Sequence, residues 1–280
     1  MRTTLLCGRF ELPLERPLVM GILNVTPDSF SDGSLHFEVD KAIAHGLRLI
    51  EQGADLLDIG AESTRPGSLP VSADEEAARL LPVIDALLDY DIPLSIDTCK
   101  PAVMRRVLDA GVDMINDIYG FRQPGAIEAV AGSDCGLCVM HMQGEPRTMQ
   151  EAPVYENVVA EVRGFLAHRV QELFAGGVQP ERLILDPGFG FGKTVEQNYE
   201  LLRHLDKLAF DDHPILVALS RKSMIGHVTG RPPAERLGGS VAGALAGIAR
   251  GAAMVRVHDV AATVDAVEVW QTVENGVSHE

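Results

Sequence analysis

The run L-V-M-G-I-L at residues 18–23, followed at once by N-V-T-P-D-S-F-S-D-G at residues 24–33, contains the pattern that decides the fold. The first part is apolar throughout and does not alternate with polar residues. Such a run is typical of a parallel strand that is covered on both faces. The second part is polar and begins where the strand is expected to end. The same unit, an apolar run with a polar end, recurs in the rest of the chain.

Seven further apolar runs follow, with longer helical patterns between them. They occupy residues 56–59, 94–96, 112–115, 137–140, 183–185, 215–219 and 254–257. Ile43, Leu47 and Ile50 have helical spacing, and Ser72 forms a capping box with Glu75 before another helical stripe. Eight strand–helix units without a linker predict the α/β class, as one closed (β/α)8 TIM barrel domain over residues 1–280. Residues 1–17 are expected to form a short N-terminal hairpin that plugs the bottom of the barrel.

An open, doubly wound sheet is the alternative architecture. It would show a G-x-G-x-x-G turn after its first strand, and no such turn is present at that position. The chain has 280 residues, 46% of them hydrophobic, which is enough for one large core. Its net charge of −16 repels nucleic acid and anionic membranes, so neither is an expected partner.

Location and redox state are expected from two further features. The N-terminus has no apolar signal segment, and the small-residue stretch at 238–249 is too short to span a bilayer, so a cytoplasmic location is expected. Cys7, Cys99, Cys135 and Cys138 do not form a disulfide framework. The C-x-x-C of the last two lacks further ligands for a metal, and we expect reduced thiols there.

Polar side chains end every one of the eight runs. In barrels of this type the active site lies at the carboxyl ends of the strands, so these groups predict a polar pocket at one mouth. Asp97, Asn116 and Asp186 could exchange several hydrogen bonds with a flat heterocycle that carries N–H and amino groups, because buried carboxylates need donors. Lys222 and Arg256 follow the seventh and eighth strands, where barrels of this type usually bind phosphate.

In this order, the motifs resemble those of the dihydropteroate synthases. The resemblance runs from about Met20 to Val267 and rests on eight segments: G-I-L-N-V-T-P-D-S-F-S-D-G, E-S-T-R-P-G, S-I-D-T, I-N-D-I, M-H-M-Q-G, D-P-G-F-G-F-G-K, S-R-K-S-M-I-G and R-V-H-D-V. It implies a transferase of folate biosynthesis and a target of sulfonamides. Such an enzyme condenses 7,8-dihydropterin-6-ylmethyl diphosphate with 4-aminobenzoate to give 7,8-dihydropteroate and diphosphate. The resemblance also implies a homodimer and a Mg2+ ion, contacted by Asn24, beside the diphosphate.

Site residues are carried over by position. The resemblance implies catalytic roles for Asp97, Asp186, Lys222, Arg256 and His258. It implies substrate contacts from Asn24, Thr64, Arg65, Pro66, Asp97, Asn116, Met140, Asp186, Phe191, Ser220, Lys222, Ser223, Arg256 and His258. The segment from Thr26 to Gly33, which contains Asp28, Phe30 and Asp32, is expected to close over the bound pterin.

Alternative functions remain open at this point. One is a pterin enzyme that moves a methyl group from methyltetrahydrofolate to a corrinoid partner, and another is a non-catalytic pterin-binding paralogue. The methyltransferase would have less use for S-T-R-P, S-R-K-S and R-V-H-D together, because it has no diphosphate to hold. The non-catalytic paralogue could lose Arg256, His258 and Asn24, all of which are present here. A third is an unrelated phosphate-binding barrel, against which the three groups Asp97, Asn116 and Asp186 argue.

Several single residues also allow a purely structural interpretation. The G-K-T at residues 192–194 resembles the end of a P-loop, but Pro187 stands where its first glycine is required. His141 could be a satisfied strand-end histidine, His258 a helix cap, and Asp117 the cap of a local turn. Arg221 and Lys222 could be a solvated pair. The glycines at 239, 243 and 247 predict close helix packing, either within the barrel or across a dimer.

Overall fold

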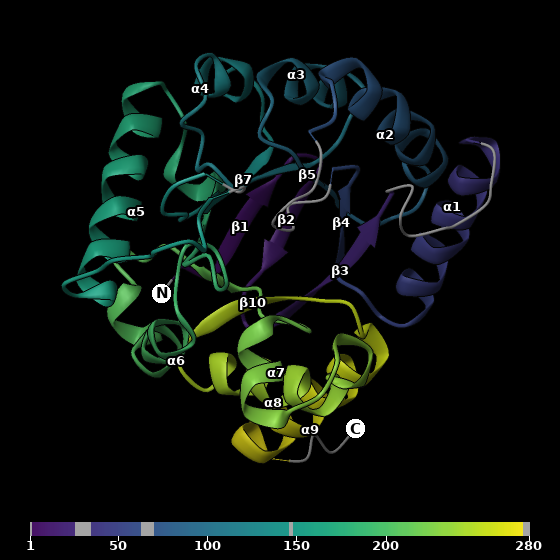
Figure 1. The fold of residues 1–280 in the computed structure, drawn as a ribbon. Coiled ribbons are helices and arrows are strands. Elements are labelled where there is room, and N and C mark those ends of the chain that lie inside the picture. The colour runs from purple at the N-terminus through teal and green to yellow at the C-terminus, as the bar shows by residue number, and fades with distance from the viewer. Residues whose placement is uncertain (1, 26–34, 63–69, 146–147, 277–280) are drawn as a thin grey trace.

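The computed structural model describes residues 2–25, 35–62, 70–145 and 148–276, without the side chains of residues 35–38. Eight parallel strands close into a barrel in the order β10-β3-β4-β5-β6-β7-β8-β9 (Figure 1). The strands are β3 (Leu18–Asn24), β4 (Leu56–Gly60), β5 (Leu94–Asp97), β6 (Met114–Asp117), β7 (Gly136–Met140), β8 (Leu183–Asp186), β9 (Ile215–Val217) and β10 (Ala252–Val257). The predicted TIM barrel is thereby confirmed, and the open sheet is excluded because β10 pairs with both β3 and β9.

Helices surround the strands in the ring seen in Figure 1. They are α1 (Leu35–Glu51), α2 (Ala73–Leu87), α3 (Pro101–Asp109), α4 (Ala126–Val130), α5 (Val158–Ala175), α6 (Val195–Arg203), α7 (Ser223–Thr229), α8 (Leu237–Ile248) and α9 (Val260–Asn275). Ser72 caps α2 by accepting a hydrogen bond from the backbone N–H of Glu75, but the Glu75 carboxylate pairs with Arg79 rather than completing the predicted capping box. Within the described ranges, no helix has both the length and the apolar character needed to cross a membrane.

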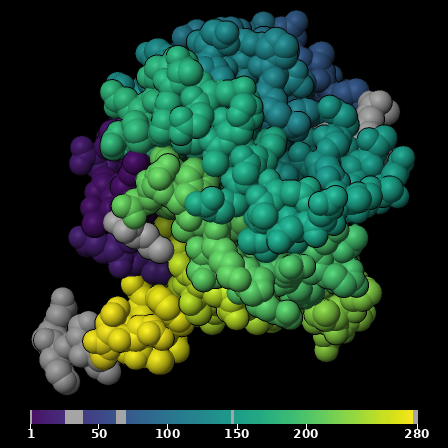
Figure 2. Space-filling view, turned by 90° about the vertical axis from the view of Figure 1, so that its left-hand side faces the viewer, coloured from purple at the N-terminus to yellow at the C-terminus, as the bar shows by residue number. Residues whose placement is uncertain are grey.

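The predicted N-terminal hairpin is present and covers one end of the barrel. Strands β1 (Thr4–Cys7) and β2 (Phe10–Pro13) pair antiparallel. The hairpin lies behind the barrel in Figure 1 and at the left edge of the side view in Figure 2. Its Leu5, Cys7 and Leu12 are buried against apolar side chains inside the barrel. Arg9 fixes its turn by an ion pair at 2.9 Å with the fully buried Asp113.

One strand starts two residues later than its apolar run. The run V-D-M-I suggested residues 112–115, whereas β6 comprises Met114–Asp117. The reason is Asp113, whose carboxylate accepts hydrogen bonds from Arg9 and from the backbone N–H of Leu94 and so holds the hairpin rather than joining the strand. Asn116 and Asp117 therefore belong to the strand itself and do not follow it.

Alternation along the strands separates two levels inside the barrel. Near the hairpin the interior is filled by Met20, Leu56, Met114, Cys138, Ile184, Leu216 and Met254. Residues two positions further point to the same side of a strand. Among them are the polar residues Asp58, Asn116, Asp186 and Arg256 and the apolar residues Ile22 and Met140. Four polar side chains, on β4, β6, β8 and β10, thus enter the interior within one step of the pleat.

The glycines of α8 pack this helix against the barrel. A Cβ atom at Gly239 would lie 2.4 Å from Ile225, and one at Gly243 would lie 2.4 Å from Leu219. At Gly247 the nearest atom, from Val217, would be 3.2 Å away. The small-residue stripe is therefore explained by close packing within the barrel, the first of the two interpretations.

Candidate active site

The polar end of the barrel interior is organised around Arg256. Its guanidinium donates to the carboxylate of Asp58 through Nε and to that of Asp97 through Nη2, the latter at 2.9 Å. The amide of Asn116 donates at 3.0 Å to Oδ2 of Asp58, the same oxygen that accepts from Arg256 Nε. Ser95 donates to Asp58 as well, at 2.6 Å. Four strands, β4, β5, β6 and β10, thus bring one connected set of side chains together.

Burial and the neighbouring charges shift the pKa values of Asp97 and Arg256. Burial raises the pKa of Asp97 to about 7, against the opposing effect of Arg256, and Asp58 raises it further. Burial alone would lower the pKa of Arg256, but Asp58 and Asp97 raise it above its ordinary value. Arg256 is therefore a permanent cation, while Asp97 can exchange a proton near neutral pH.

Asp58 was not among the predicted site residues. It is fully buried and accepts hydrogen bonds from three side chains of the site. A signal was available in the sequence, since Asp58 is the charged residue inside the run L-L-D-I. A charge within a buried strand needs partners, and those partners come from strands far away in the sequence.

A second group joins β8 to the loop after β9. Asp186 accepts a hydrogen bond from the backbone N–H of Gly188 at 2.7 Å, and burial raises the pKa of its carboxyl. Lys222 donates to the carbonyl of Phe189, and its ammonium lies 4.7 Å from the centre of the Phe191 ring. Burial lowers the pKa of Lys222 to about 8, although Asp186 opposes this. The Asp186 carboxylate and the Lys222 ammonium, both predicted to bind the pterin, therefore attract one another.

Lys193 holds the loop that follows β8. Its buried Nζ lies 2.9 Å from His141 Nδ1, 2.8 Å from the carbonyl of Gly188 and 3.0 Å from that of Phe191. Gly188 has a φ of +70°, and a Cβ there would lie 1.8 Å from the carbonyl oxygen of His141. The loop is thus fixed by glycine geometry and by an internal lysine. This Lys193 is not placed to bind a nucleotide phosphate, which settles the P-loop resemblance.

Ser220 and His258 meet where β9 and β10 end. The Ser220 hydroxyl lies 3.0 Å from His258 Nδ1 and accepts from the His258 backbone N–H at 3.2 Å. Burial, followed by Arg256 and Arg221, lowers the pKa of His258 to about 4, so the ring is neutral at pH 7. His258 is not the helix cap, because Asp259 is the N-cap of α9. Arg221 pairs with Asp259 and is therefore not a solvated residue without partners.

Other residues considered from the sequence have structural partners. Asp117 accepts from the backbone N–H groups of Tyr119 and Phe121, at 2.8 and 2.7 Å, and so caps the turn after β6. His141 is buried, and burial and Lys193 lower its pKa to about 2. Both cysteines of the C-x-x-C are free and buried, as expected, with Cys135 outside the strands and Cys138 inside the barrel.

An apolar wall flanks the polar groups. Met140 packs with Ile118, Met142 and Met149, and Phe191 lies against this cluster. Such a wall beside hydrogen-bonding groups suits a flat ring, one face of which is apolar. Ser223 is exposed at the first position of α7, and Asn24 is exposed at the end of β3. Thr64, Arg65, Pro66, Asp28, Phe30 and Asp32 lie outside the described residues.

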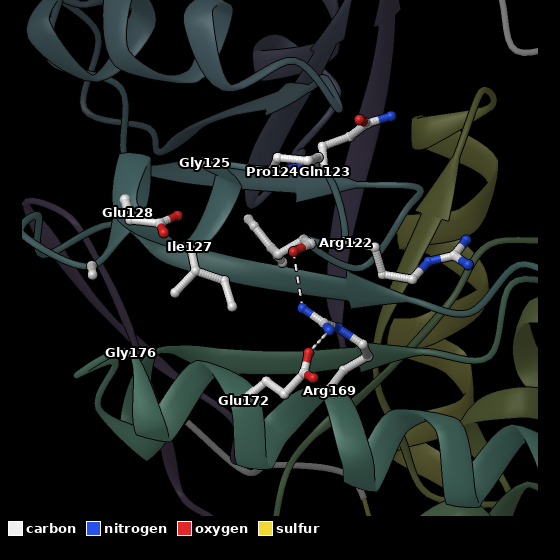
Figure 3. A pocket seen from close by; sticks show the side chains of 11 residues that line it. Arg122, Gln123, Pro124, Gly125, Ile127, Glu128, Arg169, Glu172 and Gly176 are labelled. Carbon is white, nitrogen blue, oxygen red and sulfur yellow. Dashed lines mark hydrogen bonds and ion pairs between the residues drawn. The ribbon is translucent and has the colours of Figure 1, made fainter.

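A separate hollow of about 400 Å3 lies outside the barrel, between α4 and α5 (Figure 3). Arg169 crosses it and donates to the carbonyls of Gly120 and Phe121, at 2.7 and 2.9 Å, while its third nitrogen pairs with Glu172. The arginine therefore supports the turn after β6 from behind. The polar residues of this hollow therefore have a structural role, and the candidate active site is at the strand ends.

Comparison with known proteins identifies the family to which this barrel belongs. Residues 20–258 match the family described as "Pterin binding enzyme". The chain belongs to the pterin binding enzyme family. The matched range begins in β3 and ends at His258, so this family's pattern includes every strand of the barrel and all the described groups of the site.

Members of the pterin binding enzyme family that resemble this chain are dihydropteroate synthases. The one from Neisseria meningitidis serogroup B is 50% identical over 271 residues, which cover 94% of this chain and 95% of that protein. The structure of the Burkholderia cenocepacia enzyme complexed with 7,8-dihydropteroate is 57% identical, with a TM-score of 0.90 and coverage of 97% and 96%. That of the Xanthomonas albilineans enzyme with 4-aminobenzoic acid is 52% identical, with a TM-score of 0.92 and coverage of 98% and 99%.

Proposed function

We propose that this chain is a dihydropteroate synthase. It condenses 7,8-dihydropterin-6-ylmethyl diphosphate with 4-aminobenzoate and releases diphosphate. The observation that carries the proposal is the convergence of Asp97, Asn116 and Arg256 on one mouth of a barrel whose relatives, about 50% identical over 94% of the chain, have this activity. Solved relatives hold the product 7,8-dihydropteroate or the substrate 4-aminobenzoic acid.

The pterin ring fits the polar groups by hydrogen-bond chemistry. Asp97, Asn116 and Asp186 accept and donate along the edge of the ring, while Lys222 lies near its carbonyl. Met140 and Phe191 cover the faces of the ring. The two carboxylates also favour the positive charge that develops on the ring when the bond from its CH2 group to the diphosphate oxygen breaks.

The reaction is a displacement at that CH2 group. The nitrogen of 4-aminobenzoate forms the new C–N bond, the C–O bond to the diphosphate breaks, and the amine then loses one proton to solvent. A strong general base is not needed, because the aromatic amine is already neutral at pH 7. The main demand is for positive groups around the departing diphosphate, and Arg256 with His258 supplies them. His258 is neutral before the anion binds, and a bound diphosphate raises its pKa towards protonation.

A Mg2+ ion beside the diphosphate is part of the proposal. The described residues contain no group of three carboxylate, histidine or cysteine side chains that could hold a metal. Asn24 would contribute one amide oxygen, with phosphate oxygens and water completing the shell, which suits the preference of Mg2+ for oxygen ligands. When bound, the ion supplies positive charge to the leaving group. We also propose that the enzyme is a cytoplasmic homodimer, and that Thr64, Arg65, Pro66, Phe30 and Ser223 form the 4-aminobenzoate site, which sulfonamides would share.

One assay tests the function. Purified enzyme is mixed with 7,8-dihydropterin-6-ylmethyl diphosphate and 4-aminobenzoate, with Mg2+ or with chelator, and diphosphate and 7,8-dihydropteroate are both measured. We expect equal amounts of the two products, and loss of turnover with chelator. Binding of the pterin without turnover would instead identify a non-catalytic paralogue. Transfer of a methyl group from methyltetrahydrofolate to a corrinoid would identify the other alternative.

A further inference from the structure

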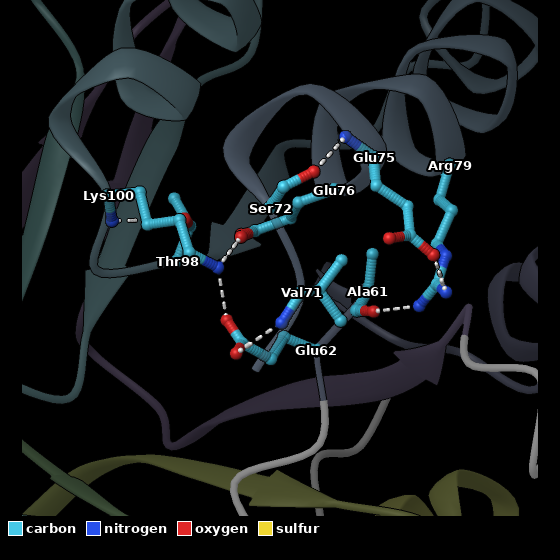
Figure 4. A network of polar contacts seen from close by, with 9 residues as sticks. All are labelled: Ala61, Glu62, Val71, Ser72, Glu75, Glu76, Arg79, Thr98 and Lys100. Carbon is cyan, nitrogen blue, oxygen red and sulfur yellow. Dashed lines mark hydrogen bonds and ion pairs between the residues drawn. The ribbon is translucent and has the colours of Figure 1, made fainter. Parts of the chain in front are cut away.

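The carboxylate of Glu62 joins the two sides of the segment that carries S-T-R-P. Glu62 immediately precedes residues 63–70, and Val71 immediately follows them. The backbone N–H of Val71 donates to Glu62 Oε1 at 3.1 Å (Figure 4). The carboxylate therefore fixes the distance between the two ends of this segment. Glu62 belongs to the motif E-S-T-R-P-G, and none of the substrate contacts proposed above uses it.

Lys100 holds Glu62 in place. Its ammonium donates to Glu62 and also to Glu76 of α2 (Figure 4). Lys100 is the N-cap residue of α3 and lies three positions after Asp97, at the end of β5. One side chain thus connects β5, α2 and the beginning of the segment. We call Glu62, Glu76 and Lys100 the clamp.

The charges of the clamp make Lys100 hard to replace. Glu76 is only 1% exposed, and its Oε1 is buried without a hydrogen-bond partner among the described residues. Burial lowers the pKa of Lys100, but the hydrogen bonds to Glu62 and Glu76 raise it above its ordinary value. Loss of the ammonium would leave a buried carboxylate without its cation, and such groups are costly. Glu62 would then be free to leave the Val71 N–H.

Helix α2 anchors the same two ends independently. Arg79 donates to the carbonyl of Ala61 at 3.1 Å, just before Glu62. Ser72, just after Val71, caps the helix through the N–H of Glu75 at 3.2 Å. The backbone on both sides of residues 63–70 is therefore tied to one helix. The clamp is the part of this anchor that also reaches the end of β5.

We propose that Lys100 is a positioning residue for the aromatic amine substrate. Through Glu62 it sets the separation and direction of the chain ends from which residues 63–70 depart. This inference rests on the proposed function, in which Thr64, Arg65 and Pro66 contribute to the 4-aminobenzoate site. Lys100 touches neither substrate. Its loss consequently weakens the use of 4-aminobenzoate and leaves binding of the pterin substrate unchanged.

The test compares Lys100→Met with the wild-type enzyme. The variant keeps the length of the side chain and removes its charge. We expect the KM for 4-aminobenzoate to rise about tenfold in Lys100→Met, because misplaced binding groups weaken substrate binding. The KM of Lys100→Arg should stay close to that of the wild type, because arginine keeps the positive charge. The Kd of the pterin diphosphate, measured by calorimetry, should change less than twofold. Glu62→Ala should reproduce the same selective increase in KM.

Arg106→Met is the matched control. Arg106 of α3 pairs with Asp74 of α2, so it links the same two helices as the clamp, but both side chains are more exposed and neither contacts Glu62. We expect its two substrate constants to equal those of the wild type. If Lys100→Met is unstable, Lys100→Met/Glu76→Gln leaves no uncompensated carboxylate at position 76 and is used in its place.

The outcomes separate the inference from the function. Equal increases in both constants would show that Lys100 is only structural, and a rise in the pterin Kd alone would show that it acts through Asp97. Either result, or an unchanged KM for 4-aminobenzoate, overturns the proposal for Lys100. Absence of turnover in both the wild type and Arg106→Met would overturn the proposed function itself.

Discussion

The two ends of the barrel interior are built from alternate residues of the same strands, and their chemistry is opposite. Near the hairpin, Leu56 and Met114 are fully buried among apolar side chains. Two residues further along the same strands, Asp58 and Asn116 are joined by a hydrogen bond at 3.0 Å. The backbone geometry is the same at both levels, so the difference lies in the side chains alone.

This difference shows how the molecule divides its tasks. Apolar burial stabilises a fold by about 25 cal/mol per Å2, and inside the barrel this burial is found at the end covered by the hairpin. Buried carboxylates cost free energy unless they have partners, and Arg256 is the partner of both Asp58 and Asp97. The attraction within this polar cluster only offsets the free energy that burying its charges costs, so the cluster adds little net stability. Its position in the barrel is therefore explained by binding of the proposed ligand.

Removal of Arg256 should give the largest effect, because it affects both fold and function. In Arg256→Met, Asp58 and Asp97 lose their shared cation inside the barrel. We expect the free energy of unfolding to fall by about 3 kcal/mol. Turnover should fall about 100- to 1,000-fold, as when one preorganised group that stabilises transition-state charge is removed. Denaturant unfolding and steady-state kinetics measure the two effects.

Arg221→Met is the control for this prediction. Arg221 also forms an ion pair, with Asp259, but its side chain is 36% exposed to solvent. Exposed pairs contribute about 0–1 kcal/mol, so this variant should be nearly as stable as the wild type. Equal losses of stability in the two variants would show that the interior position of Arg256 has no special importance.

Met114→Ala should have the opposite profile, with a large effect on stability and none on substrate binding. Met114 is fully buried next to the hairpin, two residues before Asn116. The lost contacts and the cavity should cost about 2–5 kcal/mol. At a temperature where the variant is folded, the KM for both substrates should equal that of the wild type. A raised pterin KM would mean that the two levels of the interior are coupled.

The sequence was sufficient to predict the apolar level and the closed barrel, because each depends on a local pattern. Each of the eight apolar runs contains or overlaps a strand, although β6 is shifted by two residues and β9 ends at Val217, and the hairpin covers the expected end. For the polar level, the sequence predicts which residues are present but not which of them form hydrogen bonds with one another. Asn116, Asp97 and Arg256 were expected at one mouth, whereas the role of Asp58 depends on side chains 37 to 198 positions away in the chain.

Two lysines illustrate the same limit. From the sequence, Lys193 belongs to the segment D-P-G-F-G-F-G-K and to an incomplete P-loop, without a role of its own, and Lys100 is not predicted for the site. Both act on backbone or carboxylate groups of neighbouring loops. Such partners follow from the closed barrel, which brings consecutive β–α loops together, and no local spacing in the sequence reveals them.

Asp186→Asn should show whether the charge at the polar level serves the ligand rather than the fold. Asparagine keeps an oxygen that can accept from the Gly188 N–H, which now lies 2.7 Å from the carboxylate. The melting temperature should therefore change little. A charge-assisted hydrogen bond to the pterin is lost, which should weaken its binding by about 1.5–3 kcal/mol, or roughly 10- to 100-fold. Calorimetry that shows unaltered pterin affinity would reject the role of Asp186.

The pH dependence of pterin binding should give the smallest effect, about tenfold. Asp97 binds the N–H groups of the ring as a carboxylate, and its pKa is raised to about 7 by burial. Affinity should consequently fall as the pH drops from 8 to 6, because protons then compete with the ring. Lys222 has a pKa lowered to about 8, so loss of its proton should weaken binding again above that pH. Calorimetric titrations between pH 6 and 9 should show tightest binding between these two values.

Asp97→Asn isolates the acidic side of that profile. The variant cannot lose or gain a proton at position 97, so its weaker binding should be constant from pH 6 to 7 while the decline above pH 8 persists. The sign is diagnostic, since a group that must be ionised to bind weakens affinity only on the side where it is protonated. If the variant kept the acidic decline, another group would be its origin. Asp186, whose pKa burial also raises, faces the same ligand and would be examined next.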